Sequence, residues 1–224
     1  MSQGRIWIIP ALMAGMMGIK MQEGDFELRL WVVKNISQKT SAWKINLPMD
    51  KEMVKALIRS AFSCVQYPAM GNIVSGYEED EPELVEKAFK GKKDWTVLSA
   101  EFLDKAPEDS DASALHFFSD EAFHFYLPAY LIADIDFRMK KASPAFSLSH
   151  GLTQESKNER INPKRYGERT WWDRAVYQFS IFNQEECRAV VAYLELKMAL
   201  GDKFDKPRIR EALENYWYER AGKK

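Results

Sequence analysis

The residues with the greatest potential for acid–base or metal chemistry are three histidines, His116, His124 and His150. Asp120 and His124 are four residues apart in a stretch that we predict to be helical, so they share a helix face and could both bind a metal ion. His116 lies just upstream and could supply a third ligand. Because such a spacing often arises by chance, we expect surface or capping roles for His116, Asp120 and His124. We therefore predict no metal ion or other cofactor.

Other catalytic patterns are missing from the sequence. It has no glycine-rich phosphate loop with a lysine, no serine elbow, no zinc-protease helix and no pair of cysteines separated by two residues. An enzyme of unrecognised class would need His124, Asp120 and Arg169 to converge in one pocket. Catalytic residues therefore stay unassigned, and whether the protein is an enzyme stays open.

The two cysteines, Cys64 and Cys187, are both predicted to be inert thiols. Cys64 falls at the edge of the apolar face of a predicted helix, where a buried thiol is the default. Arg188 could lower the pKa of Cys187, but the position of Cys187 at the start of a predicted helix points inward. Two cysteines do not form a disulfide framework, which favours a reducing compartment and hence the cytoplasm.

A second candidate site consists of aromatic residues and an arginine that lie close together in the sequence. Its members are Tyr166, Arg169, Trp171 and Trp172. Because Trp, Tyr and Arg dominate the binding energy of protein interfaces, this group is our candidate for contact with a protein partner. The alternative is a loop that its own aromatic residues pin to the core.

Helical periodicity, capping residues and helix breakers predict the elements that position these groups. The expected helices cover residues 51–65, 82–90, 95–106, 120–141 and 184–200, with a last helix that begins near residue 206. Ser119 is the expected cap of the fourth helix, and Asn183 and Glu186 form a capping-box pattern at the start of the fifth. A loop of about 40 residues separates the fourth helix from the fifth, and we expect residues 177–182 to be extended. No repeat is present, so the sequence predicts an all-α, single-domain fold of five to six helices.

The fourth of these helices carries aromatic side chains on nearly every side, over residues 117–130. A helix that is apolar all round is typically buried at the centre of a domain, so we expect this one to be the dry centre of the molecule. Pro128 lies inside it, and a proline in a helix interior costs about 3 kcal/mol. We therefore predict a kink or a break before Tyr130.

The first fifth of the chain differs in character from the rest. Residues 6–19 are apolar throughout but number 14, whereas a bilayer span takes about 20, so we expect no integral membrane span. Residues 26–33 and 42–47 could pair as a short β-hairpin. We predict that residues 1–48 are an accessory segment or an overcalled start and that residues 49–224 form the helical domain. Export or peripheral attachment through residues 6–19 is the alternative to a cytoplasmic location.

Charge is balanced over the whole chain. Lys and Arg number 32 and Asp and Glu 33, which leaves a formal net charge of −1. Acidic residues concentrate over residues 78–111 and basic ones over residues 157–174, where carboxylates dilute them. A chain without an excess of positive charge has no general attraction for nucleic acid, so we do not expect a nucleic-acid partner.

The run from Phe117 to Leu131, FFSDEAFHFYLPAYL, is distinctive. It resembles the core motif of a bacterial family of uncharacterised domains, and the similarity extends to residues 54–62 and 182–196. The resemblance implies a bacterial, cytosolic origin and a helical fold. It implies no activity, because no function or catalytic residue is assigned to that family.

Without a catalytic pattern, the sequence favours a protein-interaction or regulatory module, of which an immunity-type protein is one form. The alternative is the enzyme described above, with a site around His124, Asp120 and Arg169. The sequence carries no signal for an oligomeric state.

Overall fold

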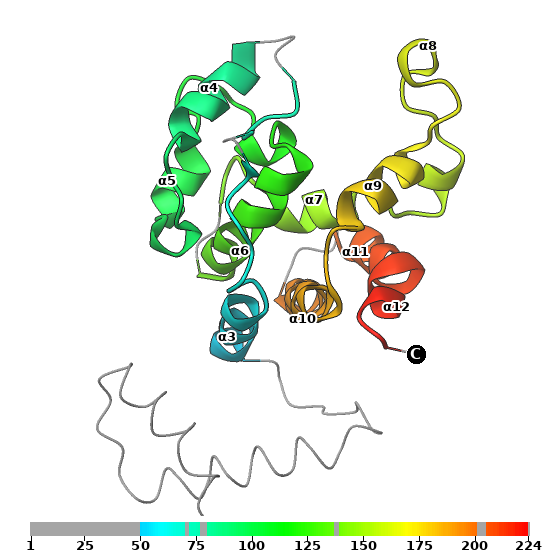
Figure 1. The fold of residues 1–224 in the computed structure, drawn as a ribbon. Coiled ribbons are helices and arrows are strands. Elements are labelled where there is room, and N and C mark those ends of the chain that lie inside the picture. Colours follow the sequence, from blue (N-terminus) through cyan, green and yellow to red (C-terminus); the bar gives the residue numbers. More distant parts are fainter. Residues whose placement is uncertain (1–49, 70–71, 77–79, 137–138, 201–204, 224) are drawn as a thin grey trace, which may run out of the picture. The chain divides into compact units, whose positions relative to one another are not determined.

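The computed structural model describes residues 50–69, 72–76, 80–136, 139–200 and 205–223. The expectations for residues 1–48, including the apolar stretch and the β-hairpin, lie outside these residues. The described chain is mainly helical, which confirms the predicted fold class (Figure 1). It contains no β-strand, only the isolated bridges Val74–Phe118 and Arg160–Thr170. No helix in these residues is long and apolar enough to cross a membrane.

The longer helices correspond to the predicted ones, and shorter elements lie between them. The α-helices are α3 (Lys51–Ala61), α4 (Asp80–Phe89), α5 (Ala100–Lys105), α6 (Asp120–Asp136), α7 (Pro144–Ser149), α8 (Pro163–Tyr166), α9 (Trp171–Phe179), α10 (Gln184–Leu200), α11 (Lys206–Ala212) and α12 (Tyr218–Arg220). Short 3₁₀ turns cover Trp95–Val97, Ala114–His116 and Glu155–Lys157, and a π-helical turn, Leu213–Trp217, joins α11 to α12.

Helix α6 lies at the centre of the domain, as its aromatic composition predicts. Tyr126 and Tyr130 are fully buried, and α3, α5 and α7 all pack against the helix. Figure 1 shows α4 and α5 together on one side of α6. Ser119 caps the helix, since its hydroxyl accepts a hydrogen bond from the amide of Ala122 at 3.1 Å.

Of the kink or break predicted before Tyr130, the break is wrong, because α6 continues through Pro128 to Asp136. Proline removes one backbone donor from the helix, but Pro128 is itself buried and so are the residues on both sides of it. Burial of the whole turn in the core therefore holds the helical backbone together.

Two helix boundaries also differ from the expectation. Helix α3 ends at Ala61, where the amide of the capping residue Phe62 donates to the carbonyls of Ile58 and Ser60. Cys64 therefore lies beyond the helix and is exposed, so the prediction of a buried thiol at this position is wrong. Asp94 caps only the 3₁₀ turn at Trp95, and Ser99 starts the helix that follows it.

The predicted loop of about 40 residues is largely helical, and the expectation of an extended segment over 177–182 is wrong. Thr170 and Asp173 form a reciprocal capping box that starts α9. Ala175 and Phe179, four residues apart, are buried on one face of α9. The spacing of the buried side chains in this segment is therefore that of a helix.

Candidate functional site

A groove of about 830 Å³ lies between the N-terminal end of α6 and a projecting segment. This segment, residues 159–171, is called the arm here. Its stem is a pair of backbone hydrogen bonds, from the amide of Ile161 to the carbonyl of Arg169 and from the amide of Trp171 to the carbonyl of Glu159, both 3.0 Å. Helix α8 forms its tip, buries none of its residues, and stands apart from the other helices (Figure 1).

Helix α9 supplies one wall of the groove. The capping box fixes its first turn, since Thr170 and Asp173 each bond the other's backbone amide through their side chains, at 2.9 and 3.2 Å. Trp171, Arg174 and Tyr177 follow at intervals of three residues, so they lie on neighbouring parts of the same surface and line the groove. Ile181, just beyond the helix, completes this wall.

The groove gathers apolar side chains that are exposed to solvent. Seven large hydrophobic side chains of the described residues are exposed, and three of them line this groove: Tyr177 (67% exposed), Tyr166 (43%) and Ile181 (37%). Isolated exposed apolar residues need no explanation, but the grouping of three in one concavity makes this groove the candidate for a site of interaction.

An ion pair joins the two walls of the groove. Arg174 Nη1 lies 3.0 Å from Asp120 Oδ1, which links α9 to the first turn of α6. Arg169 has no carboxylate within ion-pair distance among the residues that the structure describes. Its charge contributes to a lowered pKa of Asp173, although hydrogen bonds from the amide and hydroxyl of Thr170 are the larger cause.

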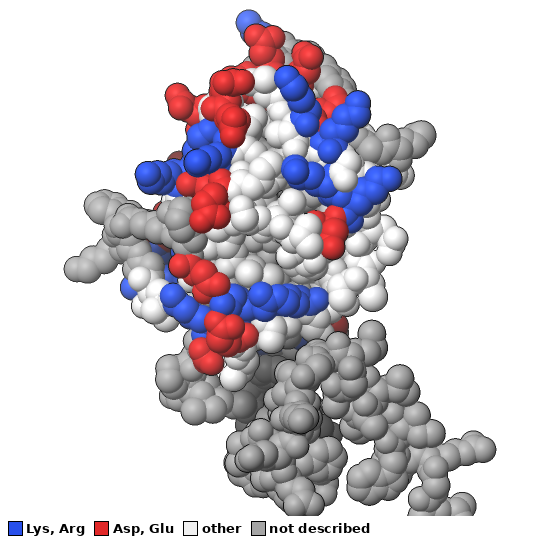
Figure 2. Space-filling model, turned by 90° about the vertical axis from the view of Figure 1, so that its left-hand side faces the viewer, with Lys and Arg blue, Asp and Glu red and all other residues white. Residues whose placement is uncertain are grey.

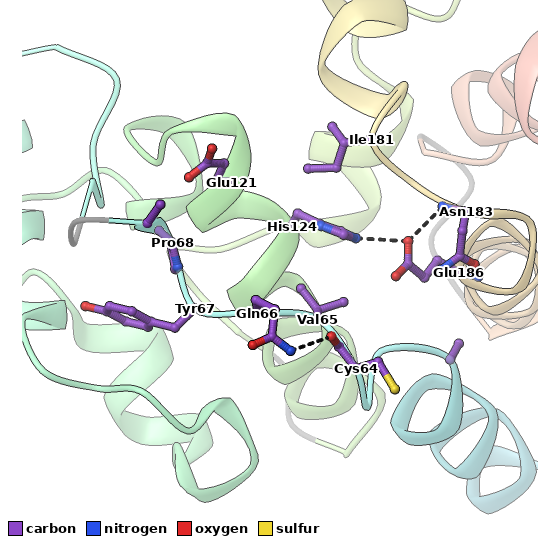
Figure 3. A pocket seen from close by; sticks show the side chains of 12 residues that line it. Cys64, Val65, Gln66, Tyr67, Pro68, Glu121, His124, Ile181, Asn183 and Glu186 are labelled. Carbon is purple, nitrogen blue, oxygen red and sulfur yellow. Dashed lines mark hydrogen bonds and ion pairs between the residues drawn. The ribbon is translucent and has the colours of Figure 1, made fainter.

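A smaller pocket of about 460 Å³ adjoins the groove (Figure 3). His124 of α6 points across it, and its Nε2 lies 2.9 Å from Oε2 of Glu186 on α10. The same oxygen accepts a hydrogen bond of 2.8 Å from the amide of Asn183, the N-cap of α10. Glu186 is only 3% exposed, so a buried carboxylate at the rear of the pocket is held by two donors.

The ring of His124 packs against two phenylalanines. Its centroid lies 4.8 Å from that of Phe182 and 6.0 Å from that of Phe62. His124 therefore connects the end of α3, the middle of α6 and the start of α10. The predicted capping box at Asn183 and Glu186 is present, since Asn183 Oδ1 also accepts from the amide of Glu186 at 3.0 Å.

The predicted binding group divides between the groove and the core. Tyr166, Arg169 and Trp171 line the groove together. Trp172 instead packs against the core, with its ring 6.4 Å from that of Tyr216 and with Lys157 Nζ 4.5 Å above it. Trp172 thus holds its part of the chain against the core, whereas Tyr166, Arg169 and Trp171 line the groove.

The residues considered for catalysis or metal binding have different neighbours. Asp120 and Arg169 line the groove, whereas His124 lines the smaller pocket, so the three do not meet in one pocket. Asp120 pairs with Arg174 and His124 with Glu186, and His116 is exposed in a 3₁₀ turn. Desolvation lowers the pKa of His116. Within the described part of the chain, no three His, Cys, Asp or Glu side chains are grouped closely enough to hold a metal ion.

Two features of the site are not predicted from the sequence. The first is the position of Tyr177 and Ile181, which lie in the segment expected to be extended. The pattern Thr170-x-x-Asp173 indicates a helix start, and this start puts Tyr177 beside Arg174. The contact of His124 with Glu186 joins residues 62 positions apart, and no local pattern predicts such a contact.

The model of one protein family, a family of unknown function called DUF6714, matches residues 50–221. The chain belongs to this family. No curated protein and no solved structure matches it. The expected resemblance to an uncharacterised domain is therefore confirmed, while the role of residues 117–131 as its core motif stays a prediction. The family match assigns no activity and no site residue.

Proposed function

We propose that this protein is a protein-interaction or regulatory module, and that a partner protein docks in the groove between the arm and α6. The observation that carries the proposal is the group of exposed Tyr166, Tyr177 and Ile181 around Trp171 and Arg169 in one concave surface. These side chains lose unfavourable contact with water when a partner covers them.

The composition of the groove supports a protein as the ligand. Tyr, Trp and Arg are the residue types whose truncation costs most at protein interfaces. The Asp120–Arg174 pair already occupies two of the charged groups, so the groove offers chiefly aromatic surface together with the guanidinium of Arg169 and the carboxylate of Glu121. An immunity-type protein, which inhibits by covering its target, is one form of such a module.

The surface away from the groove gives less support for nucleic-acid binding. On the face that carries α4 and α5, acidic and basic side chains alternate around a band of uncharged surface (Figure 2). Nucleic acid binds to surfaces on which positive charges predominate, whereas this face carries charges of both signs. A cytoplasmic location is part of the proposal and is supported by the free thiols of Cys64 and Cys187. The bacterial origin rests on the sequence resemblance alone.

Site-specific photocrosslinking in the native cell tests the proposal. A benzophenone amino acid replaces Tyr177 in one variant and Val97 in the other. Val97 is a matched control because it is 74% exposed and does not line the groove. We expect a discrete adduct at position 177 and none at position 97. Adducts of equal yield at both positions, or none at position 177, would overturn the proposal.

The partner identified in the adduct then allows a quantitative test. Tyr177→Ala is expected to weaken its binding by about 2 kcal/mol, or roughly 30-fold, as for an aromatic residue at the centre of an interface. Isothermal titration calorimetry with the purified partner measures this change, and Val97→Ala should leave the affinity unchanged.

A further inference from the structure

We propose that the smaller pocket beside the groove is a specificity pocket for a basic side chain, arginine in preference to lysine, of the docked partner. This inference rests on the proposed function, because the partner that fills the groove would supply the side chain.

The two cavities are adjacent parts of one surface. Glu121, in the first turn of α6, and Ile181, just after α9, line both of them. A chain that covers Ile181 in the groove can therefore extend one side chain past Glu121 into the pocket.

The charge of the pocket favours a cation. Glu121 and Glu186 line it, and no lysine or arginine does, in contrast to the groove with Arg169 and Arg174. Figure 3 shows Glu121 and Glu186 on opposite sides of His124. A positive group that enters the pocket would therefore meet carboxylates from both α6 and α10.

Glu186 distinguishes this pocket from an ordinary acidic surface. Its Oε2 accepts hydrogen bonds from Nε2 of His124 and from the amide of Asn183. In the part of the chain that the structure describes, no group donates a hydrogen bond to its Oε1. Glu186 is only 3% exposed, yet this oxygen is not among the buried atoms that lack a partner, so it keeps a small accessible surface at which a charged donor can bind.

Arginine suits this arrangement better than lysine. A guanidinium presents five N–H donors in a plane and is less strongly hydrated than an ammonium group, so it enters a partly buried site at lower cost. Gln66 lines the pocket as well; its Nε2 donates to the carbonyl of Cys64 at 3.0 Å, and within the described residues no group donates to its side-chain oxygen.

A small probe tests the pocket separately from the partner. Nα-acetyl-L-arginine amide is titrated into the full-length, ¹⁵N-labelled protein, and Nα-acetyl-L-citrulline amide, of nearly the same shape but uncharged, is the control probe. We expect the arginine probe to shift the amide signals of residues 64–67 and 183–187 with a dissociation constant on the order of 10 mM. The citrulline probe should leave these signals in place.

A matched pair of variants assigns the binding to the carboxylates. Glu121→Gln is expected to weaken the arginine probe about tenfold, as the loss of a hydrogen bond to a charged group does. Glu101→Gln, in the exposed first turn of α5, should change nothing. Equal shifts with citrulline, no shifts in the two segments, or full binding by Glu121→Gln would each overturn the inference. Should the probe fail while crosslinking at position 177 succeeds, only the specificity pocket is refuted.

Discussion

At the scale of single residues, one carboxylate oxygen performs two tasks. Oε2 of Glu186 accepts from the amide of Asn183, which caps α10, and from Nε2 of His124, which lies on α6. The first contact spans three residues and follows a known local pattern, so the sequence predicts it. The second spans 62 residues and depends on how the helices pack, so it becomes visible only in the structure.

Glu186→Ala is expected to lower the free energy of unfolding by about 2–3 kcal/mol. The substitution removes part of a helix cap, worth about 1 kcal/mol, and leaves the partly buried imidazole of His124 without its partner, worth about 1–2 kcal/mol. Urea denaturation followed by circular dichroism measures the change. The neighbouring Glu185→Ala is the control, because Glu185 is exposed and pairs only with Arg188, so its loss should cost less than about 0.5 kcal/mol. Equal midpoints for the two variants would contradict this account of Glu186.

At the scale of elements, α9 determines the shape of the groove. Its start depends on Thr170, whose hydroxyl accepts from the amide of Asp173 and whose own amide donates to the Asp173 side chain. Because Trp171, Arg174 and Tyr177 follow from that start, the capping box also sets the direction of three groove residues.

Thr170→Ala is expected to destabilise the protein by about 1 kcal/mol and to increase local opening of α9 roughly fivefold. Thr170→Ser keeps the hydroxyl and should behave almost as the wild type. Hydrogen exchange with mass spectrometry separates the two effects, because exchange should accelerate in residues 171–177 more than in α10. A uniform acceleration along the chain would mean that Thr170 does not act as a local cap.

The elements also show what the sequence could and could not predict. Caps at Ser119 and Asn183 and the burial of α6 were predicted correctly, since each depends on residues within one or two turns. The continuity of α6 through Pro128 was not, because the burial that supports it comes from helices elsewhere in the chain. The site was predicted in part: Arg169 and Trp171 from residue type alone, but Tyr177 only once α9 was known to be a helix.

At the scale of the whole molecule, side-chain contacts join α6 and α10 at both ends. His124 and Glu186 meet near their N-terminal halves, and Asp134 accepts from Tyr193 at 2.6 Å and lies 2.8 Å from Lys197 near their C-terminal halves. The contacts advance by about the same number of residues on both helices, so α6 and α10 run in the same direction. The smaller pocket is therefore built at the N-terminal ends of both helices, whereas of these two helices only α6 lines the groove.

Buried tyrosines make the stability of the molecule fall in alkali. Burial raises the pKa of Tyr126 and Tyr130, and burial together with Asp134 raises that of Tyr193. Burial and the neighbouring Glu195 raise the pKa of Tyr218 to about 12. Above about pH 10 the unfolded chain loses these protons while the folded protein keeps them, so stability is lost as the pH rises.

We expect the free energy of unfolding to decrease by about 1.4 kcal/mol per pH unit above pH 10 for each such tyrosine. Urea denaturation at successive pH values from 8 to 11 measures the slope. Tyr193→Phe removes one titrating group and should reduce the slope by one proton equivalent, although it also costs stability at neutral pH by losing the bond to Asp134. A slope unchanged by this substitution would show that Tyr193 ionises equally in both states.

In the arm, the groups that hold the segment in place differ from the side chains that face solvent. Helix α8 at its tip buries none of its residues, and the stem is held by backbone groups that every amino acid except proline can supply. Side chains at residues 163–166 can therefore be exchanged at little cost to the stability of the domain. Such a segment is free to diversify, and a change of target would require new residues at the tip and no rebuilding of the core.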